Sequence, residues 1–406
     1  MLLRSRRRVA TEEDARRRRA TVPRGRSRAG PDRLAALPED ILQDILVRLP
    51  ADSVLRCRAV CHSWRRLASD PAFLLDHHRR QPELALIRSY RPSDASDALP
   101  RLEALHIRAA EFRPFFGFPK QFGSHFPARA SCDGLFVVGQ CICNPTTRQW
   151  APLATGPSPH AGTVVALYRH HPSGEYRVLY WTRWNPDGNW SCLHAYCVLT
   201  VGTDQPRSVG YPRVGSWRRG IHIFGTPVLV NDILHLHWRE HTSVRHHRIL
   251  AFHTVVETFG HMSLPAAVEP RHAMHLLQMG GKLVASTGKD DMTGMTILLL
   301  HHDVWTYHYQ IKLPVMDNMH FQQELGNCWA EIVSEEQDLL VSCYGHLLHC
   351  DKKGNLVANF KFDDDMPVVL PHRLKESLIQ HKFFQKKNIP EEEEEEEKLI
   401  TVVHLD

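Results

Sequence analysis

The sequence predicts an α+β multidomain protein, in which a small all-α unit of three helices precedes an all-β domain of propeller-like repeats. Two observations support this prediction. Apolar residues recur at helical spacing between residue 37 and about residue 80. From about residue 130 onward, short apolar strands alternate with turn dipeptides. The length of 406 residues allows two or three domains of about 150 residues each.

The composition is typical of a globular protein, with 43% hydrophobic and 23% charged residues. No apolar run approaches the roughly 20 residues that a membrane-spanning helix needs, so we expect no membrane association. Ten cysteines without an apolar leader sequence favour a reducing compartment. We therefore expect a cytoplasmic location, a nuclear location, or both.

The net charge of +5 is concentrated near the N-terminus, because residues 1–33 contain 12 Arg and 4 acidic residues. This segment lacks apolar periodicity and is predicted to be a disordered tail. Its basic clusters suit a nuclear localisation signal, a nucleic-acid contact or a solvated leader. The remainder is mildly acidic, so nucleic acid is not expected as a partner of the folded part. The acidic run at 391–397 predicts a second extended tail.

The all-α unit begins with a helix from about Pro38 to Leu49. Proline suits the first turn of a helix, Glu39 and Asp40 lie near the positive end of the helix dipole, and Pro50 ends the helix. The apolar residues of this helix form a single stripe that comprises Ile41, Leu42, Ile45, Leu46 and Leu49.

Two shorter helices complete the unit. Asp52 or Ser53 can cap the second helix, and the sequence "SDP" at 69–71 ends the third. Three helices in about forty residues form too small a core to be stable alone, so we expect a partner surface to cover the unit. The apolar residues of the third helix are Val60, Trp64, Leu67 and Ala68.

Four similar segments mark the all-β domain, and each has a turn dipeptide before an apolar strand. The marker residues Gly134 and Asp232 are 98 residues apart, twice the 49 that separate Asp232 from Gly281. A "NPDG" turn at 185–188, with aromatic strands on both sides, lies in the long interval where a further repeat belongs. The four segments are "SCDGLFVV" at 131–138, "LVNDILHLHW" at 229–238, "QMGGKLVAS" at 278–286 and "SCYGHLLHC" at 342–350.

A second hairpin follows three of these segments, at 143–150, 252–259 and 350–357. Several strands in a repeat of about 50 residues predict a kelch-like propeller, because a four-stranded blade must stack on its neighbours to bury both faces. The repeats are too degenerate to give the number of blades. A β-sandwich of the same strands is the alternative.

One short motif suggests metal chemistry. The sequence "HWREH" at 237–241 matches the H-x-x-E-H pattern of inverted zinc peptidases, which places both histidines on one face of a helix. The residues before it alternate like a strand, so we interpret the match as chance.

The cysteines do not predict a metal site. Cys57, Cys61 and His62 lack a second pair of ligands at suitable spacing, and so do Cys141 and Cys143. We expect these thiols to be small core residues. The sequence contains no phosphate-binding loop or nucleophile elbow, and we expect no enzyme activity, no metal and no cofactor.

Residues 34–75 resemble the F-box. The landmarks are Leu-Pro at 37–38, an aliphatic helix, a second Leu-Pro at 49–50, Val-Cys at 60–61, Trp64 and "DPAF" at 70–73. More loosely, "SCDGLF" with "NPTTRQW" and "PVLVNDILHLHW" with "ILAFHTVVETF" resemble the F-box-associated, propeller-like region of the large plant F-box families over about 85–385. Asp232 and His253 depart from that pattern, in which glycine and aspartate are usual.

The resemblance implies a substrate receptor. An F-box binds a SKP-type adaptor, which joins it to a cullin-RING ubiquitin ligase, and the C-terminal domain binds an unknown protein substrate. Trp64 and Leu67 would also hold the helices together. The adaptor-binding residues that the resemblance implies are Leu37, Pro38, Ile41, Leu42, Ile45, Leu46, Leu49, Pro50, Val60, Cys61 and Trp64.

Three other functions stay open. They are a binding scaffold outside the ligase, a metal-dependent hydrolase that uses the "HWREH" histidines, and a nucleic-acid-binding protein that uses the arginine tail. The domains expected are an Arg-rich tail at 1–33, an F-box at 34–80, a linker and the start of the β domain at 81–129, an F-box-associated domain at 130–385 and an acidic tail at 386–406.

Overall fold

The computed structural model describes residues 37–90, 101–107, 110–116, 128–153, 163–184, 193–210, 221–223, 225–240, 247–265, 274–288, 294–313, 329–332, 338–343, 346–362 and 366–385. The two charged tails, expected at 1–33 and 386–406, lie outside these ranges. The chain divides into two compact units, which meet in the sequence at Leu46 and Val47. Each unit is described by itself.

The described part of the first unit contains one helix, α2 (Glu39–Leu46). Its first turn forms as predicted, because the Leu42 N–H donates to the Pro38 carbonyl at 3.1 Å. Two acidic residues lie in that turn, at the positive end of the helix dipole. The helix ends at Leu46, whereas the sequence predicted that it continues to Leu49 and ends at Pro50.

Three helices open the second unit: α3 (Ala51–Cys57), α4 (His62–Leu67) and α5 (Pro71–Arg80). The prediction of three helices in the all-α unit was wrong by one, because the "SDP" sequence that ends α4 also begins α5. Asp70 caps α5, because its side chain accepts hydrogen bonds from the backbone N–H groups of Ala72 and Phe73, at 2.9 and 3.0 Å.

The cap predicted for α3 was wrong. Pro50 occupies the N-cap position and offers no side-chain acceptor. Asp52 and Ser53, the predicted caps, lie inside the first turn of the helix. Val60 was expected in the third helix but lies in the turn before α4.

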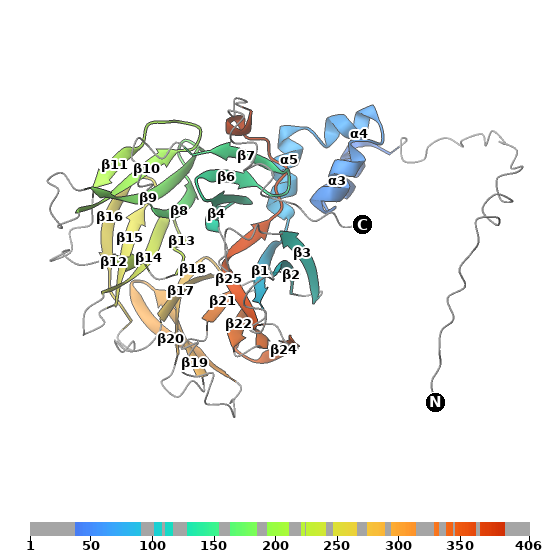
Figure 1. The fold of residues 1–406 in the computed structure, drawn as a ribbon. Coiled ribbons are helices and arrows are strands. Elements are labelled where there is room, and N and C mark those ends of the chain that lie inside the picture. Colours follow the sequence, from blue (N-terminus) through green and yellow to red (C-terminus); the bar gives the residue numbers. More distant parts are fainter. Residues whose placement is uncertain are drawn as a thin grey trace, which may run out of the picture. The chain divides into compact units, whose positions relative to one another are not determined.

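The rest of the second unit is a six-bladed β-propeller, and Figure 1 shows its sheets arranged around a common centre. The alternative of a β-sandwich is therefore wrong. Blade 1 contains β1 (Glu83–Tyr90), β2 (Arg101–His106), β3 (Glu111–Phe116) and β25 (Met366–Lys375); blade 2 contains β4 (Ala128–Cys132), β5 (Leu135–Val138), β6 (Cys141–Asn144) and β7 (Gln149–Pro152); blade 3 contains β8 (Thr163–Arg169), β9 (Tyr176–Trp184), β10 (Leu193–Thr200) and β11 (Arg207–Gly210); blade 4 contains β12 (Ile221–Ile223), β13 (Val228–Val230), β14 (Ile233–Glu240), β15 (His247–His253) and β16 (Thr258–Met262); blade 5 contains β17 (Met274–Met279), β18 (Lys282–Gly288), β19 (Gly294–His301) and β20 (Val304–Lys312); blade 6 contains β21 (Trp329–Ile332), β22 (Leu339–Cys343), β23 (His346–Cys350) and β24 (Leu356–Lys361).

Blade 1 closes the ring, because it combines the first three strands of the domain with the last. Its strand order is β25-β1-β2-β3, and β25 runs antiparallel to β1 with Glu83 opposite Lys375 and Tyr90 opposite Met366. The innermost strand of this blade therefore comes from the far end of the chain. Three of its strands lie at 81–129, where the sequence predicted a linker and the start of the β domain.

Among the described residues, six clusters of buried apolar side chains fill the spaces between neighbouring blades. Each cluster takes residues from two adjacent blades, and together they run around the ring from the space between blades 1 and 2 to the space between blades 6 and 1. Alternate residues of one strand enter different clusters: Leu135 and Val137 pack against blade 3, and Phe136 packs against blade 1. Burial of both faces explains apolar runs such as "LFVV".

The predicted missing repeat is blade 3, whose aromatic strands β9 and β10 pair from Trp184 opposite Leu193 to Arg177 opposite Thr200. The "NPDG" turn itself lies outside the described residues. Two of the four similar segments join the first and second strands of a blade, and the segment at 229–238 joins β13 to β14 in blade 4, where β12 and β13 both pair with β14. The fourth, at 342–350, joins the second and third strands of blade 6. The prediction that it occupies the same place in its blade as the other three segments was therefore wrong by one hairpin.

The turns of these first hairpins have a common backbone. Asn231 and Asp232 have φ values of 49° and 62°, and Asp133 and Gly134 have φ values of 51° and 82°. A two-residue hairpin turn with both φ values positive follows the twist of the strands, and Asn, Asp and Gly tolerate it best. Asp232 therefore serves where the plant families usually have glycine.

Candidate partner-binding surfaces

Helix α2 has exposed apolar side chains on one side. Ile41 and Ile45 are 45% and 47% exposed, whereas Leu42 and Leu46 are buried. The exposed pair is four residues apart and shares one face of the helix. Leu37, just before the helix, is half-buried, and Pro38 is exposed. Contiguous exposed apolar side chains of this kind typically mark a binding surface.

In the second unit, α3 and the turn that follows it also expose apolar side chains. Leu55 and Val60 are 36% and 60% exposed. Of the other residues that the sequence implied here, Leu49 and Trp64 are half-buried and Pro50 is exposed.

The prediction that Cys61 is a buried core thiol was wrong. Its side chain is exposed, and its Sγ lies 3.1 Å from the Ser63 Oγ. The residue precedes α4 at its N-cap, so its side chain does not belong to the buried side of that helix. Cys143 is buried as predicted, and Cys57 and Cys141 are half-buried.

Polar contacts fix the geometry of α3, α4 and α5. The Arg58 guanidinium donates two hydrogen bonds to the Ala68 carbonyl, from Nε at 3.0 Å and from Nη2 at 2.8 Å. The His77 ring on α5 lies 2.8 Å from the Leu49 carbonyl through its Nε2. Burial lowers the pKa of His77, so the neutral ring is favoured.

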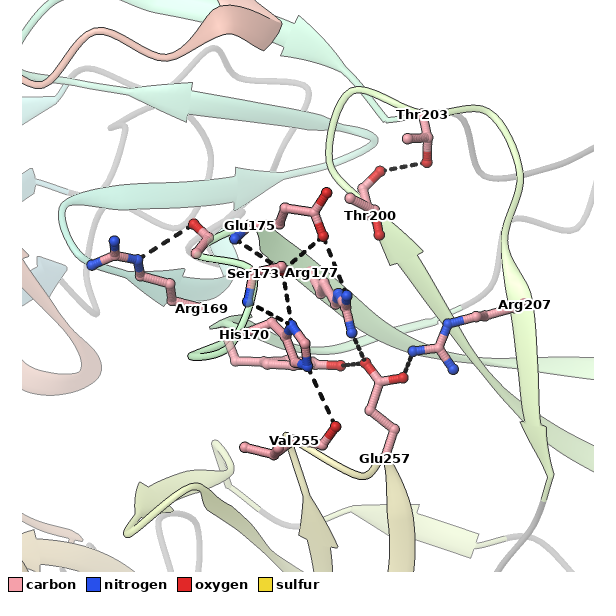
Figure 2. Close-up of polar contacts among 12 residues, drawn as sticks. Arg169, His170, Ser173, Glu175, Arg177, Thr200, Thr203, Arg207, Val255 and Glu257 are labelled. Carbon is pink, nitrogen blue, oxygen red and sulfur yellow. Dashed lines mark hydrogen bonds and ion pairs between the residues drawn. The ribbon is translucent and has the colours of Figure 1, made fainter.

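A buried carboxylate joins blades 3 and 4 of the propeller. Glu257, in the turn between β15 and β16, accepts hydrogen bonds from the Tyr168 hydroxyl at 2.7 Å and from the Arg177 Nη1 at 2.7 Å. Its other oxygen contacts the Arg207 guanidinium. Figure 2 shows Glu257 between Arg177 and Arg207, which come from two different strands of blade 3. This cluster connects two blades by charge-assisted hydrogen bonds.

A serine, a histidine and a glutamate lie beside this cluster, but their order does not suit catalysis. The Ser173 Oγ lies 2.8 Å from the His170 Nδ1 and 2.8 Å from the Glu175 Oε2 (Figure 2). In a catalytic triad the acid orients the histidine. Here the acid contacts the serine, and the second ring nitrogen of His170 lies 3.3 Å from the Val255 carbonyl. The arrangement is that of a hydrogen-bonded turn.

The "HWREH" motif does not have the conformation of a zinc peptidase. Residues His237 to Glu240 belong to strand β14, as predicted, so they cannot form the helical face that binds zinc in that family. His241 lies outside the described residues. In the part of the chain that the structure describes, no three His, Cys, Asp or Glu side chains form a group that could hold a metal.

The innermost strands of the propeller line a cavity of about 210 Å³. Its charged residues include Glu83 and Arg373, which form an ion pair at 3.1 Å, and Asp133, which accepts a hydrogen bond from the Tyr176 hydroxyl at 3.1 Å. The protein itself thus provides a partner for each of these two acids.

Comparison with known proteins agrees with this architecture. Residues 34–80 match the family model described as F-box-like. The chain is 25% identical over 289 residues to the F-box protein At5g49610 of Arabidopsis thaliana, covering 69% of this chain and 65% of that protein. It is 24% identical over 267 residues to the Arabidopsis F-box protein At5g18160, covering 62% and 64%.

A third Arabidopsis relative, the F-box/kelch-repeat protein At1g13200, is 24% identical over 162 residues, which cover 34% of this chain and 35% of that protein. The chain thus spans just under two thirds of the length of the two longer matches. Among solved structures, the Dos1 propeller matches with a TM-score of 0.35 and 7% identity, covering 65% of this chain and 66% of that one.

These observations define the class of the protein: an F-box-like domain followed by a six-bladed β-propeller. The chain contains an F-box-like domain and is distantly homologous to F-box and F-box/kelch proteins of Arabidopsis. Among the helices that the structure describes, none has the length and apolar character to cross a membrane.

Proposed function

We propose that this protein is a substrate receptor of a SKP–cullin–F-box ubiquitin ligase, acting in the cytoplasm, the nucleus or both. The observation that supports this proposal best is the exposure of apolar side chains in the F-box-like region, at Ile41 and Ile45 of α2, at Leu55 of α3 and at Val60 in the turn before α4. All four residues lie within the segment that matches the F-box-like family model, and exposed apolar side chains in each unit are suited to contact with a SKP-type adaptor.

The receptor would act without chemistry of its own. The adaptor would hold the F-box on a cullin-RING ligase, and the propeller would bind a target protein near the ubiquitin-charged enzyme. Glu257 joins two blades and Ser173 belongs to a hydrogen-bonded turn, and the mechanism needs no reacting group from either residue. Loops at the ends of the strands would provide the target contacts, because loops on a rigid scaffold commonly do so.

The adaptor contact is tested by co-purifying the full chain with a SKP-type adaptor. The test variant replaces Leu37, Pro38 and Ile41 with alanine. If these residues anchor the adaptor, affinity should fall by about 2 kcal/mol or more, roughly 30-fold, because anchors account for most of the energy of an interface. Exposed apolar residues of the propeller give a matched control, the triple alanine variant of Val256, Leu356 and Val357.

Loss of binding in the F-box variant alone would support the proposal. Equal binding of both variants would contradict the role of these three residues. Failure of the wild-type protein to bind any SKP-type adaptor, while its propeller melts cooperatively, would contradict the receptor function and favour a binding scaffold outside the ligase.

A further inference from the structure

Helix α3 lacks a cap from its own sequence. The first turn of any helix leaves backbone N–H groups without intrahelical partners. At α3 the N-cap residue is Pro50, which provides no side-chain acceptor. A helix of seven residues is also too short to be stable by itself. The conformation of α3 must therefore depend on contacts from elsewhere in the protein.

Glu376 provides the missing acceptor from a point 325 residues further along the chain. Its Oε2 accepts a hydrogen bond from the Ala51 N–H, the first residue of α3, at 2.7 Å. A carboxylate also suits the positive end of a helix dipole. The Glu376 carbonyl lies 3.1 Å from the Nδ1 of His78 on α5. One residue thus contacts two of the three helices of the second unit.

The position of Glu376 depends on the closed propeller. It directly follows β25, the strand that closes blade 1. The next residue, Ser377, is fully buried; its carbonyl accepts a hydrogen bond from the Asn144 Nδ2 at 2.9 Å, and its N–H donates to the Thr146 Oγ1 at 3.2 Å. Both partners belong to blade 2 or its last turn, so two blades fix the backbone on either side of Glu376.

The segment continues onto blade 3. The ring of His381 packs edge-on against the ring of Tyr176 with centroids 5.3 Å apart. Phe383 and Phe384 pack against the apolar cluster between blades 2 and 3. We call residues 376–385 the C-terminal strap. It runs from the closing strand across blades 2 and 3 while its first residue caps α3.

We propose that Glu376 is a positioning residue for adaptor binding, and that the C-terminal strap makes the binding competence of α3 depend on closure of the propeller. This inference rests on the proposed receptor function. The carboxylate caps α3, and α3 carries Leu55, which is 36% exposed. A chain whose propeller has not closed would leave α3 uncapped and would bind the adaptor less well.

The experiment measures the affinity of the full chain for a purified SKP-type adaptor in four proteins: wild type, Glu376→Ala, Glu376→Gln and Lys382→Ala. Lys382 is an exposed residue of the same strap and provides the matched control. Removing a helix cap typically weakens the capped state by a factor of about 5. We expect a similar or larger loss of affinity in Glu376→Ala, a smaller loss in Glu376→Gln, which keeps an acceptor oxygen, and none in Lys382→Ala.

Hydrogen exchange of the backbone amides supplies a second measurement. In Glu376→Ala, residues 51–57 should exchange faster while the amides of β22 and β23 keep their protection. Unchanged affinity and unchanged exchange in α3 would overturn the proposal. If Glu376→Ala also unfolds the propeller, the folded Glu376→Gln protein decides the question, and wild-type affinity with unchanged exchange at residues 51–57 in that variant would overturn the proposal. Failure of the wild type to bind would instead refute the receptor function on which the proposal rests.

Discussion

Replacing Glu257 with glutamine should strongly destabilise the propeller. The Glu257 side chain is 4% exposed and the Arg177 side chain 14%. The substitution preserves the size of the side chain but removes the charge that compensates Arg177 and Arg207. Breaking a buried ion pair by removing one partner typically costs 3–5 kcal/mol. Glutamine retains one acceptor oxygen, so we expect a loss of about 3 kcal/mol in the free energy of unfolding.

The contacts of the same arginine provide a matched control. Glu175 also pairs with Arg177, at 3.2 Å, but its side chain is 50% exposed. Solvent screens such a pair, so Glu175→Ala should cost less than about 1 kcal/mol. Tyr168 is fully buried and donates to the Glu257 carboxylate. Tyr168→Phe should therefore cost about 1.5–3 kcal/mol, the usual range for a hydrogen bond to a charged group.

Thermal melting of the three variants beside the wild type tests the assignment. For a domain of this size a loss of 1 kcal/mol lowers the melting temperature by about 2 °C, so Glu257→Gln should melt about 6 °C lower. The order of destabilisation should be Glu257→Gln, then Tyr168→Phe, then Glu175→Ala. A Glu257→Gln protein that melts with the wild type would refute the role of this carboxylate in joining blades 3 and 4.

Three further predictions concern ring closure and the exposed thiol. A Cβ on Gly134, which has φ +82°, would lie 2.3 Å from the Lys375 carbonyl oxygen, so Gly134→Ala should lower the melting temperature far more than Gly210→Ala, which has φ +80° but nothing within 4 Å; equal shifts would contradict the close contact. Burial lowers the pKa of His372 on β25 to about 4. Because the unfolded chain binds the proton more readily, stability should be full above pH 6.5 and should fall as the pH drops towards 4, by roughly 3 kcal/mol from this residue. The difference between the melting temperatures at pH 7.5 and pH 5 should become smaller in a folded His372→Asn variant, and an unaltered pH dependence would contradict the assignment. Exposed Cys61 should react with iodoacetamide in the native protein, whereas Cys143, whose pKa burial raises to about 12, should not; peptide mass mapping, with the SKP-type adaptor expected to protect Cys61, checks both.

The local features of the fold could be predicted from the sequence because they depend on nearby residues. Asp70 and Pro71 define a helix boundary through hydrogen bonds within three residues. The aromatic strands around 185–188 predicted blade 3 because apolar alternation and a turn signal lie within one hairpin. The wrong assignment of the hairpin at 342–350 also has a local cause, since a hairpin between second and third strands has the same sequence pattern as one between first and second strands.

The long-range features could not be predicted in this way. Nothing near Glu257 indicates that a glutamate with φ 53° in the turn at 254–257 is buried between two arginines of another blade. The exposure of Cys61 depends on where α4 begins, and the pattern of Val60, Trp64 and Leu67 placed that start too early. The cap of α3 comes from Glu376, which no local rule connects with residue 51. Such contacts exist only after the ring has closed.

Closure also explains why the order of the domains has consequences for function. Strands β1, β2 and β3 follow α5 directly, but their blade is complete only when β25 pairs with β1. The clusters on both sides of blade 1 contain residues of β25, including Val369 on one side and Leu374 on the other. A chain that stops before β25 would therefore leave two of the six spaces between blades incomplete, and it would also lack the residue that caps α3. In the proposed receptor, the same late pairing that completes the propeller would complete the helices that bind the adaptor. Incomplete chains would then compete poorly for the ligase, because they would have neither a capped helix α3 nor a closed propeller.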